Sequence, residues 1–73
     1  MERATILEHL ALAEKHIKEA EAHIAQQREI IAQIRSVGQD SSIAEKLLGS
    51  FEEMQLLHLA DRDRIRAELA KDQ

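Results

Sequence analysis

Three histidines recur at seven-residue intervals in the run EHLALAEKHIKEAEAHI. His9, His16 and His23 each precede a large aliphatic residue. Imidazole nitrogens can bind a metal ion or take up a proton near neutral pH. Seven helical residues span about 10.5 Å, however, so these three side chains cannot share one ion. The spacing instead favours one edge of a packed helix, where each imidazole rests its carbons on a core and keeps one nitrogen in water or bonded to a carboxylate.

A metal site could still form if carboxylates and a fourth histidine joined this row. Spacings of three or four residues place potential ligands on one helix face, and the candidates are His16, Glu19, His23, His58 and Asp61. The Glu-x-x-His order of carboxylate-bridged bundles is reversed here, which argues against such a site. We therefore expect ordinary packing, with no metal and no cofactor. A further alternative is a pH-responsive bundle, whose melting temperature would change between about pH 5.5 and 7.5.

Apolar residues between positions 4 and 37 follow a heptad pattern. One position, named a here, is aliphatic four times in succession, at Leu10, Ile17, Ile24 and Ile31. Position d, three residues later, holds Ile6, Ala13, Ala20, Gln27 and Ile34, and position g holds the three histidines followed by Ile30 and Val37. A heptad sustained over this length predicts one long helix, over about 4–37, packed along an a/d seam.

The segment 38–42 predicts a turn. Gly38 suits the left-handed residue that ends many helices. Ser42 and Glu45 fit a capping box at the start of a second helix, with Asp40 and Ser41 as alternative caps. A break this short allows an antiparallel hairpin, or a hinge that opens in a swapped assembly.

The second helix is expected over about 43–70. In the same lettering, position a holds Ala44, Phe51, His58 and Ile65, and position d holds Leu47, Met54, Asp61 and Glu68. The leucines of MQLLHLA surround most of the helix circumference, so one partner helix cannot cover them all. Gly49 interrupts the helix at a cost of roughly 1 kcal/mol relative to alanine, and it would suit either a close helix contact or a bend.

The hairpin geometry predicts which residues lie at the same level. For a turn near residues 38–41, facing residue numbers should sum to about 78–80. His58 is then expected near Ala20, between His16 and His23. Asp61 is expected near Ile17 and Glu19. A polar stretch would therefore lie in the middle of the rod.

The leucines of MQLLHLA, together with Leu7 and Leu12 at the open end of the hairpin, need further cover and predict an oligomer. Two helices bury one face each, and isologous pairing of two hairpins into an antiparallel four-helix bundle would cover the rest. The fold class we expect is therefore all-α, a single hairpin domain that dimerises or forms a higher oligomer. The expected core and interface residues are Leu10, Ile17, Ile24, Ile31, Leu47, Phe51, Met54 and Ile65.

Charge and composition argue against most other functions. The net charge is −4, with neither a basic patch nor an apolar run of the ~18 residues that span a bilayer. Arg62, Arg64 and Arg66 could contact phosphates, but they alternate with acidic residues and more simply form helix-surface ion pairs. Without cysteine or a glycine-rich phosphate loop, no catalytic pattern is present. We expect a cytoplasmic protein that is not an enzyme and binds neither membrane nor nucleic acid.

Two runs of the sequence are similar to those of a known group of proteins. HLALAEKHIKEAEAHIAQQREIIAQI followed by FEEMQLLHLADRDRIRAEL resembles a group of short bacterial helical-hairpin proteins of uncharacterised function. The resemblance implies a bacterial source and a hairpin fold, and it implies no activity. The expected architecture is also similar to that of Rop-like regulators, acidic hairpins that dimerise and bind paired RNA loops, although no sequence motif carries RNA-binding residues across. The leading interpretation is a self-associating structural or interaction module, which could also bind another protein; a Rop-like RNA regulator is the alternative.

Overall fold

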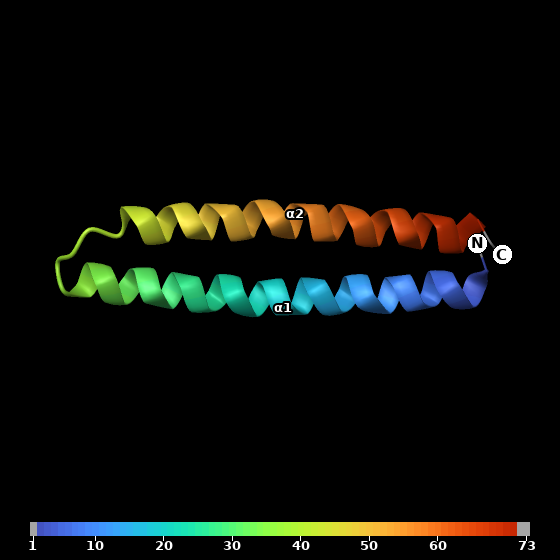
Figure 1. The fold of residues 1–73 in the computed structure, drawn as a ribbon, viewed down its shortest axis with the longest axis horizontal. Coiled ribbons are helices and arrows are strands. Elements are labelled where there is room, and N and C mark those ends of the chain that lie inside the picture. Colours follow the sequence, from blue (N-terminus) through green and yellow to red (C-terminus); the bar gives the residue numbers. More distant parts are fainter. Residues whose placement is uncertain (1, 72–73) are drawn as a thin grey trace.

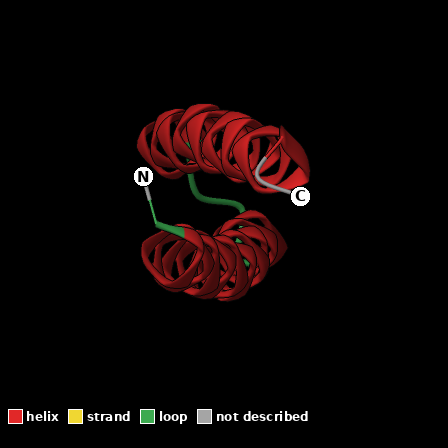
Figure 2. Ribbon diagram, turned by 90° about the vertical axis from the view of Figure 1, so that its right-hand side faces the viewer, coloured by secondary structure: helices red, strands yellow, loops and turns green. Residues whose placement is uncertain are grey.

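The protein is an antiparallel hairpin of two long helices (Figure 1). The computed structural model describes residues 2–71. Helix α1 spans Arg3–Ser36 and helix α2 spans Ser42–Lys71. The rod measures 56 × 14 × 12 Å between Cα atoms, and Figure 2 shows the two helices packed side by side as one layer. The expected helical hairpin is confirmed, with each helix end within one residue of its predicted position.

Gly38 ends α1 as the sequence predicts. Its φ of 75° lies in the left-handed region. The amide of Gly38 donates to the carbonyl of Arg35 at 3.0 Å, and the amide of Gln39 donates to the carbonyl of Ile34 at 3.1 Å. These two bonds form a Schellman motif, which satisfies carbonyls that the helix end would otherwise leave unpaired.

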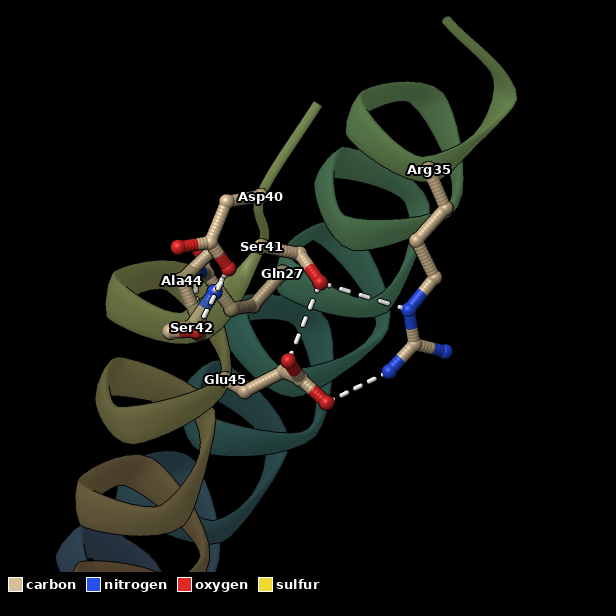
Figure 3. A network of polar contacts seen from close by, with 7 residues as sticks. All are labelled: Gln27, Arg35, Asp40, Ser41, Ser42, Ala44 and Glu45. Carbon is tan, nitrogen blue, oxygen red and sulfur yellow. Dashed lines mark hydrogen bonds and ion pairs between the residues drawn. The ribbon is translucent and has the colours of Figure 1, made fainter. Parts of the chain in front are cut away.

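The cap of α2 differs from the predicted capping box (Figure 3). Ser41, one of the two alternative caps, takes the place of Ser42, because its carbonyl accepts the first helical hydrogen bond, from the amide of Glu45 at 2.9 Å. The Ser41 hydroxyl is buried, donates to the Glu45 carboxylate at 3.0 Å and accepts from the Arg35 guanidinium at 3.3 Å. The Ser42 amide instead donates to the Asp40 carboxylate at 3.0 Å. Shifting the cap by one residue lets Ser41 and Glu45 bond to α1, which fixes how the two helices join.

Asp40 makes the stability of the turn depend on pH. Hydrogen bonds from the Ser42 hydroxyl, and then from its backbone amide, lower the pKa of the Asp40 carboxyl. The stabilisation is therefore present above the unfolded-state pKa, about 3.9, and is lost as the pH falls through the lower folded-state pKa. We expect the carboxyl carbon of Asp40 to titrate, by NMR, at a lower pH than in the variant Ser42→Ala. Identical midpoints would contradict this assignment.

The two glycines predict opposite responses to alanine. A Cβ at Gly49 would meet nothing within 4 Å, so no contact within the hairpin requires glycine there. Gly49→Ala should therefore stabilise the protein by about 1 kcal/mol and raise the melting temperature by about 4–8 °C. Gly38→Ala places a side chain at positive φ and should cost about 1–2 kcal/mol. Thermal unfolding by circular dichroism measures both changes, and a loss of stability in Gly49→Ala would refute the first.

Helix α1 packs through the predicted a/d seam. Among residues 2–71, the buried hydrophobic side chains are Ile6, Ala13, Ile17, Ile31 and, from α2, Ile65. The other aliphatic a and d residues of α1 are half-buried: Leu10, Ala20, Ile24 and Ile34. The heptad therefore identified the inner face of α1 along its whole length.

Helix α2 is rotated relative to the prediction. Its expected d residues Leu47 and Met54 are exposed and lie beside the seam. The row four residues after position a takes their place: Leu48, Gln55, Arg62 and Leu69. On this face Leu69 packs against the buried core and Leu48 is half-buried, which removes apolar surface from water. The acidic residues Asp61 and Glu68 of the expected row are half-buried as well.

Two glutamines tie the helices across the seam. Gln27 is buried, and its side-chain amide donates to the carbonyl of Ala44 at 3.0 Å. The amide of Gln55 donates to the carbonyl of Ile17 at 3.1 Å. Because a one-turn slip would leave these amides without partners, the pair fixes the register of the hairpin.

Gln55 also carries a buried oxygen, Oε1, without a hydrogen-bond partner. An unpaired buried polar atom costs about 1–3 kcal/mol. Gln55→Met keeps the side-chain length and removes this atom, so we expect a rise of about 1 kcal/mol in the free energy of unfolding. Chemical denaturation measures the change. If Gln55→Met proves less stable than wild type, the bond to Ile17 outweighs the unpaired oxygen.

One edge of the hairpin is closed by ion pairs. Three pairs link the helices there, between Arg35 and Glu45, between Arg28 and Glu52 at 3.4 Å, and between Arg66 and Glu14 at 3.8 Å. The α1 members occupy position e, and the α2 members recur at multiples of seven residues. We call this side the ion-pair edge. Each exposed pair contributes only about 0.2–1 kcal/mol, but together they favour this rotation of α2 over others.

Candidate functional site

The opposite side, the histidine edge, holds position g of α1 and the displaced d row of α2. It carries His9, His16 and His23 from α1, beside Leu47 and Met54 from α2. Positions e and g flank a helix seam on opposite sides, so the ion pairs and the histidines necessarily lie on different edges. The placement follows directly from the heptad order of α1.

A groove of about 410 Å³ runs along the middle of the histidine edge. Its wall on α1 is formed by His16, Glu19, Ala20 and His23, and its wall on α2 by Ser50, Phe51, Met54 and His58. The rings of His16 and His58 meet across the hairpin with their centroids 5.5 Å apart and their planes inclined at 44°. His23 lies against Phe51 with ring centroids 6.1 Å apart. The groove is therefore lined mainly by rings and aliphatic carbons.

The polar residues were predicted to meet in the middle of the rod. His58 borders the same groove as Ala20, His16 and His23, as expected, and its ring lies against that of His16. Asp61 lies with His9 and Ala13, not beside Ile17 and Glu19, in a second hollow of about 130 Å³ toward the open end. The numbers of His16 and His58 sum to 74, whereas those of the ion pairs Arg28–Glu52 and Arg35–Glu45 sum to 80, so a residue of α2 meets an α1 residue nearer the open end on the histidine edge than on the ion-pair edge.

The candidate metal ligands do not assemble. Within residues 2–71, no three histidine, aspartate or glutamate side chains are placed to hold one ion. Glu19 is exposed and lies 4.0 Å from Lys15 on the same helix. Asp61 accepts a hydrogen bond from Arg64, which raises the pKa of that guanidinium. Each of the two carboxylates thus pairs with a cationic side chain of its own helix, and the pH-responsive bundle stays a prediction.

Most large apolar side chains that the hairpin leaves exposed lie on the histidine edge. Along the helices these are Leu12, Ile30, Ile43, Leu47, Met54 and Leu57. On the other side, Leu7 and Leu56 are the comparable exposed residues of the described helices. The sequence analysis named Leu47 and Met54 as interface residues and counted Leu12 and Leu57 among the leucines that need cover, but it did not single out Ile30. Their heptad positions were the available signal. Ile30 shares position g with the histidines, Leu12 lies one turn before His16 on the same helix, and Leu57 occupies position g of α2.

The eight residues predicted for the core divide into two groups. Six belong to the seam within one hairpin, where they are buried or half-buried: Leu10, Ile17, Ile24, Ile31, Phe51 and Ile65. Leu47 and Met54 are exposed and border the groove side of α2. The hairpin therefore uses six of them itself and leaves two available to a partner.

The three arginines of ADRDRIRAEL do not form a common surface. Arg62 faces the seam side and pairs with Asp63 at 3.0 Å. Arg64 pairs with Asp61 and, at 3.7 Å, with Glu68. Arg66 reaches across the ion-pair edge to Glu14. Each guanidinium is thus already next to a carboxylate, as expected for a solvated charged face.

Comparison of the whole chain with known proteins gives no match. No family matches the chain, and neither a curated protein nor a solved structure is similar to it. The suggested kinship with short bacterial hairpin proteins therefore stays a prediction. Neither helix within residues 2–71 has the combined length and hydrophobicity that crossing a membrane requires.

Proposed function

We propose that the protein is a self-associating structural module, a helical hairpin that pairs with a second copy to form a four-helix bundle and has no catalytic activity of its own. The observation that supports this proposal is the apolar histidine edge. Exposed apolar surface gathered on one side of a small protein is typical of an interaction site.

The thin core of the hairpin supports the same proposal. Among the described residues, only five hydrophobic side chains are buried, and none is less than 2% exposed. Domains of this size bury a small share of their surface and commonly need a disulfide, a metal or a partner chain. The chain contains no cysteine, and its histidines and carboxylates form no metal cluster within residues 2–71. A second copy is the reinforcement that fits these observations.

The groove offers little support for an enzyme. Its one hydroxyl belongs to Ser50, which donates to the carbonyl of Lys46 at 3.3 Å. A serine nucleophile needs a base within hydrogen-bonding reach, usually an imidazole oriented by a third group. The Rop-like alternative gains no support from the arginines either, because Arg64 and Arg66 bond to carboxylates on different edges.

Molar mass in solution tests the proposal. We expect light scattering at neutral pH to give twice the mass of one chain. The mass should fall toward that of a single chain only when the protein is strongly diluted. Circular dichroism at the same concentrations should report mostly helix. A folded protein with the mass of a single chain at every concentration would refute self-association.

A further inference from the structure

We propose that two copies join through their histidine edges in antiparallel orientation, with their turns at opposite ends of the bundle. This inference rests on the proposed self-association and specifies the surface and the geometry of the partner. The apolar groove of one chain then faces the same groove of a second chain. A two-fold axis perpendicular to the rod relates the two chains.

The contrast between the two edges selects the surface. On the ion-pair edge, guanidinium and carboxylate groups already join α1 to α2. Covering these three pairs, which run along the whole edge, would remove six charged groups from water without new partners, whereas the charges of the histidine edge lie mainly in one half. The histidine edge presents Leu12, Ile30, Leu47, Met54 and Leu57, whose burial is favourable. A second copy therefore gains more by covering the histidine edge.

Charge along the histidine edge selects the orientation. Toward the open end this edge carries Asp61, Arg64 and Glu68, and Glu19 borders the groove near the middle, whereas from His23 to the end of α1, and from Leu47 to Met54 on α2, its positions hold no charged residue. A parallel pair would set Asp61 against Asp61 and Glu68 against Glu68, and like charges at an interface cost several kcal/mol. An antiparallel pair sets the charged half of each copy against the uncharged half of the other.

The two-fold axis then passes near the middle of the rod. Ala20 lies midway along α1 and Leu57 midway along α2. The groove walls of both copies would face each other there, with Ala20 allowing close approach. The imidazoles of His16 and His58 would lie next to this centre, where their ring carbons can pack against the partner and a nitrogen can reach the rim.

Cysteine scanning tests this geometry cleanly, because the chain has no native cysteine. Leu57→Cys lies near the axis and should cross-link to its own copy with a short bis-maleimide. Ile43 and Lys71 each lie 14 residues from Leu57, on the same face of α2. In the antiparallel pair, two copies of Ile43→Cys are about 40 Å apart, at 1.5 Å per residue, and should not cross-link. Mixed Ile43→Cys and Lys71→Cys chains should cross-link to each other.

Leu56→Cys is the matched control, since Leu56 neighbours Leu57 and is equally exposed but faces the other side of α2. Cross-linking of Leu56→Cys in preference to Leu57→Cys would place the interface on another surface and overturn the inference. Self-linking of Ile43→Cys would overturn the antiparallel orientation. In either case a dimeric mass would leave the proposed self-association intact, whereas a monomeric mass would refute both. Circular dichroism of each variant confirms that it is folded.

Discussion

Aspartate in place of Ile17 is expected to leave the chain largely unfolded at 25 °C. Ile17 is 6% exposed, in the middle of the α1 seam. The substitution removes buried apolar surface and puts a carboxylate in its place, which together cost upwards of about 4 kcal/mol. A domain of this size has roughly 3–5 kcal/mol of stability from its core. The magnitude of the helical circular dichroism signal at 222 nm should therefore fall to that of a mostly unfolded chain.

Ala22→Asp is the control for this experiment. Ala22 is exposed on the outer face of the same helix, so its substitution changes charge and helix propensity without touching the seam. We expect the helicity of Ala22→Asp to stay close to wild type, with a small loss of stability of about 0.5 kcal/mol. Equal helicity in Ile17→Asp and Ala22→Asp would show that the seam assigned to α1 is wrong.

Glutamate in place of Met54 is expected to separate the dimer while leaving the hairpin folded. Met54 is 53% exposed and borders the groove, so its replacement disturbs little within one chain. In the proposed dimer, however, it would bring a carboxylate into the centre of an apolar interface. Central interface residues commonly contribute about 2 kcal/mol, so the dissociation constant should rise by about 30-fold. Sedimentation equilibrium measures this constant directly.

Leu56→Glu provides the matched variant, because Leu56 is 67% exposed on the same helix but outside the histidine edge. It introduces the same charge at a distance of two residues, so it controls for the overall increase in negative charge. We expect its dissociation constant to stay within about threefold of wild type. Equal weakening by both substitutions would indicate a general charge effect and would contradict a specific interface at Met54.

The sequence defines the candidate site in part. The heptad order places His9, His16 and His23 on one edge of α1, and the structure has them there. The meeting of His58 with the histidine row was also predictable, because an antiparallel hairpin brings the middle of α2 to the middle of α1. The choice of His16, and not His23, as the ring in contact with His58 was not. It depends on the register of the helices, and a shift of one turn moves every cross-helix pair.

The sequence alone determined the two helices, the turn and the inner face of α1. Helix propensity and a four-fold aliphatic repeat act locally, and Gly38 ends the first helix through its own backbone conformation. Only the tertiary structure decided the rotation of α2. Its leucines surround the helix, so hydrophobicity alone allowed more than one inner face. Packing against α1 selects one of them, because that face lets Gln27 and Gln55 bond across the seam and lets the arginines of α1 reach Glu45 and Glu52. The same rotation leaves Leu47 and Met54 on the outside, and so creates the apolar edge on which the proposed function depends.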